Sequence, residues 1–193
     1  GPVEPLSLIG AVMRLFQQEG TARLGRIFAF MGVKGGTGSS TIAQNVAWSL
    51  AQRDRKVLLV DMDLQFGTAA LNLDIDSPAG FAEQLGDAGR LDEGLLERLL
   101  FKRGPNLSVL AGATSSHHAA EPALEVVDRM LDLARATFPF VVLDLPHAWS
   151  PWVRRSLLAA DEVVLTAAPE LASLRNAQCL MDLLREARPN DAK

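Results

Sequence analysis

The chain has 193 residues, which is enough for one domain with a sizeable core but short for two. Its residues are 48% hydrophobic and 22% charged, close to the averages of globular proteins, and this excludes a disordered or fibrous chain. The 19 basic and 23 acidic residues give a net charge of −4, which excludes the global basic field that drives non-specific binding to nucleic acids or anionic membranes.

The cysteine content and the absence of targeting patterns indicate the compartment. Cys179 is the single cysteine and cannot form an internal disulfide, and the sequence has neither a long apolar run nor a signal-peptide pattern. We therefore expect a soluble, cytoplasmic protein with no nucleic-acid partner. Gly1 and Pro2 are typical of the scar left by a processing protease, so we expect the natural protein to extend further at its N-terminus.

The first predicted element is an amphipathic helix over residues 6–18. Its apolar residues Leu8, Val12 and Phe16 recur at helical spacing, and a turn or short connection leads from there to residue 25. We expect this helix to cap the domain or to link it to another one.

The rest of the chain alternates between predicted strands and helices. Residues 26–32 are almost wholly apolar and end in glycine, the pattern of a strand that is buried on both faces. Strands are predicted over residues 26–32, 56–61, 106–110, 140–145 and 161–167, and helices over 42–52, 121–137, 151–159 and 170–187, with small helices near 68–73, 81–85 and 91–100. This alternation predicts an α/β fold, a doubly wound and mainly parallel sheet with helices on both faces.

A glycine-rich loop follows the first predicted strand. Residues 33–41 read Val-Lys-Gly-Gly-Thr-Gly-Ser-Ser-Thr, at the point where a buried strand ends and a helix begins. A helix N-terminus offers unpaired N–H groups, and glycines allow the backbone to curl those groups around an anion. The loop therefore predicts a site for a di- or triphosphate; a glycine-rich turn without a ligand is the alternative.

The loop departs from the general phosphate-loop pattern in one chemically important way. Gly38 and Ser40 match that pattern, but Ser39 stands where a lysine belongs and Val33 where the first glycine belongs. A charged contact to a phosphate contributes about 1.5 to 3 kcal/mol, so the loss of this lysine predicts nucleotide affinity lower by roughly one to two orders of magnitude. Hydrolysis of a bound triphosphate depends on charge stabilisation more than binding does, so we predict weak or undetectable hydrolysis unless another cation substitutes.

The loop resembles a known family. The segment from Lys34 to Thr41 is similar to the deviant Walker A motif of the MinD/ParA family of P-loop ATPases, whose signature lysine lies early in the loop. Residues 61–65, Asp-Met-Asp-Leu-Gln, resemble its switch I, and residues 141–146 resemble its Walker B strand running into switch II. The resemblance implies a P-loop NTPase fold of the MinD/ParA type that is shortened at its C-terminal end.

Within that family the chain most resembles the CpaE/TadZ branch, which comprises localisation and assembly factors of Tad (Flp) pili. The similarity rests on Ser39 in place of the second lysine and on residues 45–48, 64–68 and 144–147. It implies an ATPase-like domain over residues 26–193, and a linker helix within residues 3–25 that comes from an upstream receiver-like domain.

The resemblance also implies the ligands and the residues that hold them. The expected cofactors are ATP or ADP with Mg²⁺, and the expected nucleotide-binding residues are Lys34, Gly35, Gly36, Thr37, Gly38, Ser39, Ser40 and Thr41. Mg²⁺ is expected to be held by Ser40, Asp61, Asp63 and Asp144. Asp63 would also position the attacking water, and Lys34 would reach the phosphates of a partner subunit. A solvated loop lysine, and carboxylates that only cap helices or face solvent, are the alternatives.

The expected partners follow from the same resemblance. They are a second copy of the chain, bound through the nucleotide face, and pilus-assembly proteins; recruitment to the cell pole or the inner membrane would occur only through such partners. Two other functions stay open. One is a nucleotide-independent scaffold with a decayed loop, and the other is an active partitioning or septum-placement ATPase.

A few other residues have possible chemistry but predict no site of their own. His117 and His118 lack neighbouring cysteines at zinc spacing. His147 could respond to a bound nucleotide, but a surface imidazole is the simpler interpretation. Trp149 is expected in packing or in a partner contact, and Cys179 as a small, half-buried filler.

Overall fold

The computed structural model describes residues 24–75, 91–111 and 121–189. The predicted helix over residues 6–18, the small helix near residues 81–85 and the pair His117-His118 lie outside the described residues.

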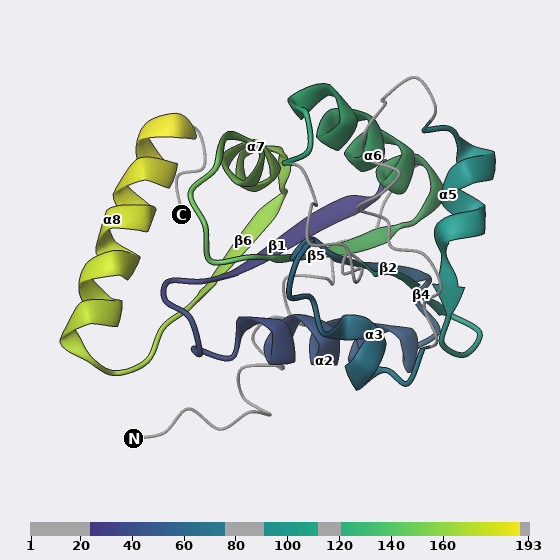
Figure 1. The fold of residues 1–193 in the computed structure, drawn as a ribbon, viewed down its shortest axis with the longest axis horizontal. Coiled ribbons are helices and arrows are strands. Elements are labelled where there is room, and N and C mark those ends of the chain that lie inside the picture. The colour runs from purple at the N-terminus through teal and green to yellow at the C-terminus, as the bar shows by residue number, and fades with distance from the viewer. Residues whose placement is uncertain (1–23, 76–90, 112–120, 190–193) are drawn as a thin grey trace.

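The described residues form a sheet of six strands in the order β3-β4-β2-β5-β1-β6 (Figure 1). The strands are β1 Arg26–Gly32, β2 Val57–Asp61, β3 Phe101–Lys102, β4 Leu107–Leu110, β5 Phe140–Leu145 and β6 Glu162–Thr166. Only β3 pairs antiparallel, against β4; the other pairings are parallel. The predicted doubly wound, mainly parallel sheet is confirmed, whereas β3 was missed because two residues are too few to show a periodic pattern.

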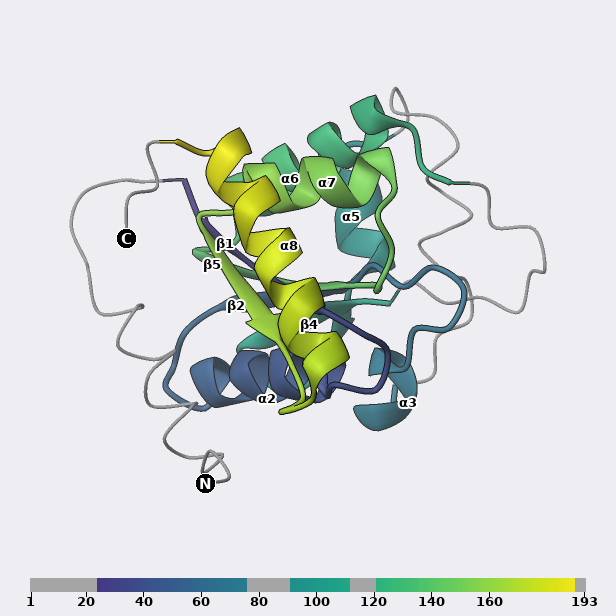
Figure 2. The same ribbon diagram turned by 90° about the vertical axis from the view of Figure 1, so that its left-hand side faces the viewer.

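Helices cover both faces of this sheet. The helices are α2 Ser39–Ala51, α3 Ala69–Asn72, α5 Glu93–Leu99, α6 Leu124–Thr137, α7 Pro151–Ala159 and α8 Leu171–Ala187. Figures 1 and 2 show α2 and α3 on one face, α5, α6 and α7 on the other, and α8 beside the edge strand β6. The start of α2 at Ser39 lies three residues before the predicted start, because its first turn consists of polar residues that carry no apolar signal.

Strand β1 forms the centre of the core. Its alternate residues face opposite ways: Ile27 and Met31 pack with residues of α6 and α7, while Phe28 and Phe30 pack with residues of α2. All four side chains are at most 2% exposed. A strand fixed on both faces holds its carboxyl end rigidly, and that end is where the glycine-rich loop begins.

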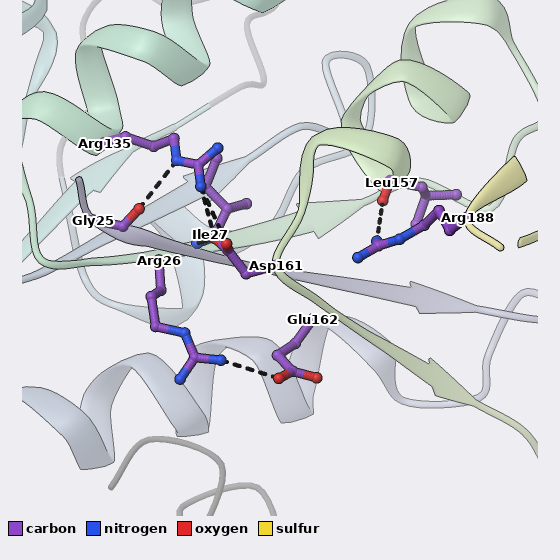
Figure 3. A network of polar contacts seen from close by, with 8 residues as sticks. All are labelled: Gly25, Arg26, Ile27, Arg135, Leu157, Asp161, Glu162 and Arg188. Carbon is purple, nitrogen blue, oxygen red and sulfur yellow. Dashed lines mark hydrogen bonds and ion pairs between the residues drawn. The ribbon is translucent and has the colours of Figure 1, made fainter. Parts of the chain in front are cut away.

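The opposite end of β1 is held by a polar network (Figure 3). Arg135 Nε donates to the Gly25 carbonyl at 3.1 Å, and Arg135 Nη2 donates to both carboxylate oxygens of Asp161, each at 3.1 Å. The Ile27 amide donates to Asp161 Oδ2 at 2.7 Å. Beside it, Arg188 Nη1 donates to the Leu157 carbonyl at 3.0 Å. The start of β1 is therefore tied to α6 and to the residue before β6, and the end of α8 is tied to α7.

Within the described residues, no helix combines the length and the apolar character needed to cross a membrane.

Candidate functional site

The glycine-rich loop lies between the carboxyl end of β1 and the first turn of α2. Gly36 and Gly38 have φ values of 81° and 82°, in the left-handed region where a side chain would be strained. Gly38 is the N-cap of α2, and no side chain from residues 24–75, 91–111 or 121–189 caps this helix start. The first helical hydrogen bond runs from the Ile42 amide to the Gly38 carbonyl, so the amides of the first turn are available to a ligand.

The loop is folded tightly against the end of its own strand. A Cβ at Gly32 would lie 2.6 Å from Thr37 Oγ1 and 2.9 Å from the Lys34 carbonyl, so only glycine fits there. Thr37 Oγ1 donates to the Lys34 carbonyl at 3.0 Å and lies 3.0 Å from Thr166 Oγ1 at the end of β6. These contacts fix the curl of the loop in the absence of a ligand.

Lys34 is paired at the outer edge of the loop. Its Nζ donates to Glu170 Oε1 at 2.7 Å, and Ser173 Oγ donates to the same oxygen at 3.1 Å. The hydrogen bond from Lys34 lowers the pKa of Glu170 below its ordinary value. Both side chains are about half exposed, 50% for Lys34 and 47% for Glu170, so a stronger anion can compete for the lysine. Nothing in the sequence singled out Glu170 as a partner of the loop.

The two loop serines have different surroundings. Ser40 Oγ donates to Asp144 Oδ1 at 3.1 Å. The Ser39 side chain is turned into the protein: the residue is 9% exposed, and its Oγ has no hydrogen-bond partner among the described residues. The position that a lysine occupies in the general phosphate-loop pattern is thus held by a neutral, buried hydroxyl.

Two buried carboxylates lie beside Ser40. Asp61 ends β2 and Asp144 lies in β5, and the two residues are register partners on adjacent parallel strands. Burial raises the pKa of Asp144 to about 7, and the charge of Asp61 adds to this shift. Burial likewise raises the pKa of Asp61 to about 6. Two acids with raised pKa values at one sheet edge form a site that a cation would stabilise.

Asp61 is also held by the backbone of the segment that follows it. Its Oδ1 accepts from the Asp63 amide at 3.1 Å, and its Oδ2 accepts from the Ala69 amide at 3.0 Å. A Cβ at Gly67 would overlap Asp61 Oδ2 and the Asp63 carbonyl. The glycine at position 67 therefore allows the segment to wrap closely around the carboxylate.

Asp63 has a local role in this structure. Its Oδ1 accepts from the Phe66 amide at 2.9 Å and from the Gln65 amide at 3.3 Å, which closes the turn after β2. The sequence left open a helix-capping or solvent-facing role beside the expected catalytic one, and it did not indicate this turn. The structure thus brings Ser40, Asp61 and Asp144 together and places Asp63 next to them, with one oxygen engaged in the turn.

Three further contacts were not predicted. Asn72 Nδ2 donates to Gln44 Oε1 at 2.9 Å, which joins α3 to α2. His147 Nδ1 lies 2.9 Å from the Gly32 carbonyl, so this imidazole contacts the end of β1 as well as being exposed. Asn176 Nδ2 donates to the Val33 carbonyl at 3.0 Å. Each contact joins residues that are far apart in the sequence, so no local sequence pattern could predict it.

The ligand chemistry of the site follows from its donors. The described residues contain no group of three or more His, Cys, Asp or Glu side chains that could hold a metal by themselves. One hydroxyl and two carboxylates suit Mg²⁺, which prefers oxygen ligands and usually completes its shell with water and phosphate oxygens. The loop amides suit the phosphates themselves. The fold and this site together define a P-loop NTPase-type α/β domain.

Comparisons with known proteins narrow this class. Residues 25–192 match the AAA_31 family, described as an AAA domain. The ParA family ATPase of Chlorobium tepidum is 30% identical, with a TM-score of 0.73, and the match covers 83% of this chain and 68% of that structure. The chain therefore belongs to the MinD/ParA family of P-loop ATPases.

Two MinD proteins illustrate the range of the similarity. MinD of Pyrococcus horikoshii, solved in complex with Mg-ADP, is 26% identical with a TM-score of 0.70, and the match covers 84% of this chain and 66% of that structure. The septum site-determining protein MinD of Synechocystis is 26% identical over 83% of this chain. The chain spans 60% of the length of that curated relative.

Proposed function

We propose that this chain binds Mg-ATP or Mg-ADP in the glycine-rich loop and acts as a nucleotide-responsive dimeric switch. The main observation behind the proposal is that the first turn of α2, whose amides are available to a ligand, lies beside a pair of buried carboxylates. The loop amides would donate hydrogen bonds to the phosphates. The Ser40 hydroxyl, which bonds Asp144, would lie between the phosphates and that carboxylate. The bound MinD of Pyrococcus horikoshii supports the choice of ligand.

The residues at the sheet edge fit Mg²⁺. Ser40 would ligate the ion directly, and Asp144 would hold it either directly or through a water. Because both Asp61 oxygens already accept backbone amides, Asp61 would act through water. Bound Mg²⁺ would supply positive charge against the phosphate oxygens. The raised pKa values of both acids support this site, since a nearby cation lowers the cost of ionising them.

The second element of the proposal is weak or absent hydrolysis. Ser39 provides no charge to the γ-phosphate, and its hydroxyl is turned into the protein. Lys34 is the basic residue of the loop over residues 33–41, and its pairing with Glu170 holds it at the outer edge. In a dimer, Lys34 would exchange Glu170 for the phosphates of the partner subunit, which carry more charge than one carboxylate. Asp63 would position a water only after releasing part of the turn that it closes.

The third element is the cellular role. We propose a positioning or assembly factor of a Tad (Flp) pilus system, recruited to its site by pilus-assembly proteins. This rests on the resemblance to the CpaE/TadZ branch, above all on Ser39 combined with a retained Lys34. A MinD- or ParA-type partitioning ATPase is the second candidate, favoured by the relatives with those names. Appreciable ATP turnover by this chain would favour that second candidate.

Measuring the molecular mass of the chain in solution during a nucleotide titration tests the proposed nucleotide-dependent dimerisation. We expect Mg-ATP to convert the wild-type chain from monomer to dimer, because two Lys34 side chains would bridge the two phosphate sites. Lys34→Ala should remain monomeric at the same nucleotide concentration. Lys56→Ala is the matched control, since it removes an exposed lysine outside the loop and should dimerise as the wild type does. Dimerisation of Lys34→Ala at the wild-type nucleotide concentration would refute the role in trans, and binding without any dimer would refute the switch.

A further inference from the structure

A groove runs along α8, bounded on its other side by α7 and by the loop that precedes α7. Two adjoining cavities of about 260 and 270 Å³ open along it, and Trp149 and Leu183 line both. The first cavity lies toward the ends of the two helices, where Leu158 and Leu184 line it together with the charged residues Arg154 and Glu186. The second cavity is mainly apolar and lies between α8, the loop before α7 and the end of β1. The two cavities share Trp149 and Leu183, so the groove is continuous from the loop before α7 to the last turns of α8.

The side chains of this groove are unusually open to water for residues of their kind. Trp149 is 46% exposed and Leu183 is 43% exposed. Ser173 is the one buried residue of the 17 in α8, so the helix lies against the domain without being covered by it. Figure 2 shows α8 crossing the open side of the molecule. Exposed apolar side chains along a groove, with polar and charged residues at its end, are typical of a docking site for an amphipathic helix.

The chain itself carries a segment that matches this surface. Residues 6–18 place Leu8, Val12 and Phe16 on one helical face. A helix of this length extends about 20 Å, enough to lie along a groove bounded by the nine residues of α7. An apolar stripe of this kind needs a surface to cover it.

The start of β1, to which this segment leads along the chain, lies near one end of the groove. Asp161, which bonds the Ile27 amide and the Arg135 side chain, lies three residues after Leu158 of the groove (Figure 3). Arg188, which follows α8, bonds the Leu157 carbonyl at the same end of the molecule. Residues 19–24 can span up to about 20 Å when extended, so residue 18 can reach the end of the groove next to Leu158.

We propose that residues 6–18 dock as an amphipathic helix in the groove between α7 and α8, with Leu8, Val12 and Phe16 against Trp149 and Leu183. The docked helix runs in the same direction as α8, because its C-terminal end lies nearest to the start of β1. It also covers the flank of the phosphate loop, since His147 and Asn176 line the groove and bond the Gly32 and Val33 carbonyls. This docking does not depend on the proposed nucleotide function.

Cross-linking to Cys179 tests the proposal directly. Cys179 is the single cysteine of the chain, is exposed and lines the second cavity. In the full chain, Leu8→Cys and Val12→Cys place a second thiol on the apolar face of the segment, and Arg14→Cys places one on the opposite face as the matched control. After treatment with a short bismaleimide, we expect intrachain cross-links at positions 8 and 12 at least fivefold more abundant than at position 14. Mass spectrometry of the monomer band measures them.

Two results would overturn the proposal. One is cross-linking that is equal at the three positions or absent from all of them. The other is cross-linking confined to covalent dimers, which would assign the groove to a second copy of the chain.

A second measurement avoids the introduced cysteines. The double substitution Leu8→Glu and Val12→Glu should release the segment, because it places two charges against apolar side chains. We then expect Cys179 to react with a thiol reagent several-fold faster than in the wild-type chain. An unchanged rate of Cys179 labelling in the folded variant would contradict the docking.

Discussion

At the scale of single residues, Ser39 is the substitution with the largest chemical consequence. A lysine at this position would bring an ammonium group to the phosphates, whereas the Ser39 hydroxyl is turned into the protein and has no hydrogen-bond partner in the part of the chain that the structure describes. A buried hydroxyl without a hydrogen bond gives no stability in return. We therefore expect Ser39 to weaken the ligand site without strengthening the fold, and we attribute the expected low turnover to it.

Restoring the lysine tests this attribution. We predict that Ser39→Lys binds Mg-ATP roughly 10- to 100-fold more tightly, because one charged contact to a phosphate contributes about 1.5 to 3 kcal/mol. Ser39→Ala, which removes the hydroxyl without adding charge, should bind within about twofold of the wild type. Fluorescent-nucleotide displacement measures all three proteins. Equal affinity of the lysine variant and the wild type would show that Ser39 is not the limiting residue.

The two buried acids predict a pH dependence of stability. Their pKa values are raised to about 6 for Asp61 and about 7 for Asp144, so the folded protein holds protons that unfolding releases between pH 4 and pH 7. The contribution of both groups to stability therefore falls as the pH rises through this window. Without nucleotide or Mg²⁺, we expect the free energy of unfolding to drop by roughly 2 to 4 kcal/mol between pH 5 and pH 8.

Denaturant unfolding across this pH range measures the effect. Asp144→Asn should flatten the profile, because an amide does not titrate. A wild-type chain that is as stable at pH 8 as at pH 5, together with an unchanged profile in Asp144→Asn, would contradict the assignment.

At the scale of elements, side-chain hydrogen bonds fix the conformation of the segment from β2 to α3 more than local sequence propensity does. Asp61 binds the Asp63 and Ala69 amides, and Asn72 binds Gln44 on α2. Apolar periodicity found β2 and the small helix near residue 69, because both signals are local. Apolar periodicity could not show that the Asp61 carboxylate binds amides along the whole segment. That arrangement depends on the close approach of the backbone to Asp61 at Gly67.

Gly67→Ala tests the importance of this wrap. The added Cβ would overlap Asp61 Oδ2 and the Asp63 carbonyl, so we expect the free energy of unfolding to fall by about 1 to 3 kcal/mol. Gly94→Ala is the matched control, because its Cβ would meet only Asp92 Oδ1 at an ordinary 3.5 Å in α5. The control should be neutral or stabilising by up to about 1 kcal/mol. Equal effects of the two substitutions in thermal unfolding would remove the special role of Gly67.

At the scale of the whole molecule, the fold was more predictable than the site. The sequence shows the buried apolar runs of β1 and β5 and the glycine-rich loop that follows β1. Together they predict a sheet covered by helices on both faces and a ligand site at the carboxyl ends of its strands. The pairing of Lys34 with Glu170, and the contact of His147 with Gly32, join segments more than 110 residues apart and follow only from the topology. The groove between α7 and α8 is likewise a property of packing.

A calorimetric titration of Mg-ATP into the full chain tests the central claim, that the loop amides and the Ser40–Asp144 pair form a working phosphate site despite Ser39. We predict one nucleotide per chain with a dissociation constant of roughly 10 µM to 1 mM, weaker without Mg²⁺. Gly38→Val should abolish binding while the chain stays folded, because Gly38 has a φ of 82° and valine is strained there. An absence of heat at millimolar Mg-ATP, or equal binding by Gly38→Val, would contradict it.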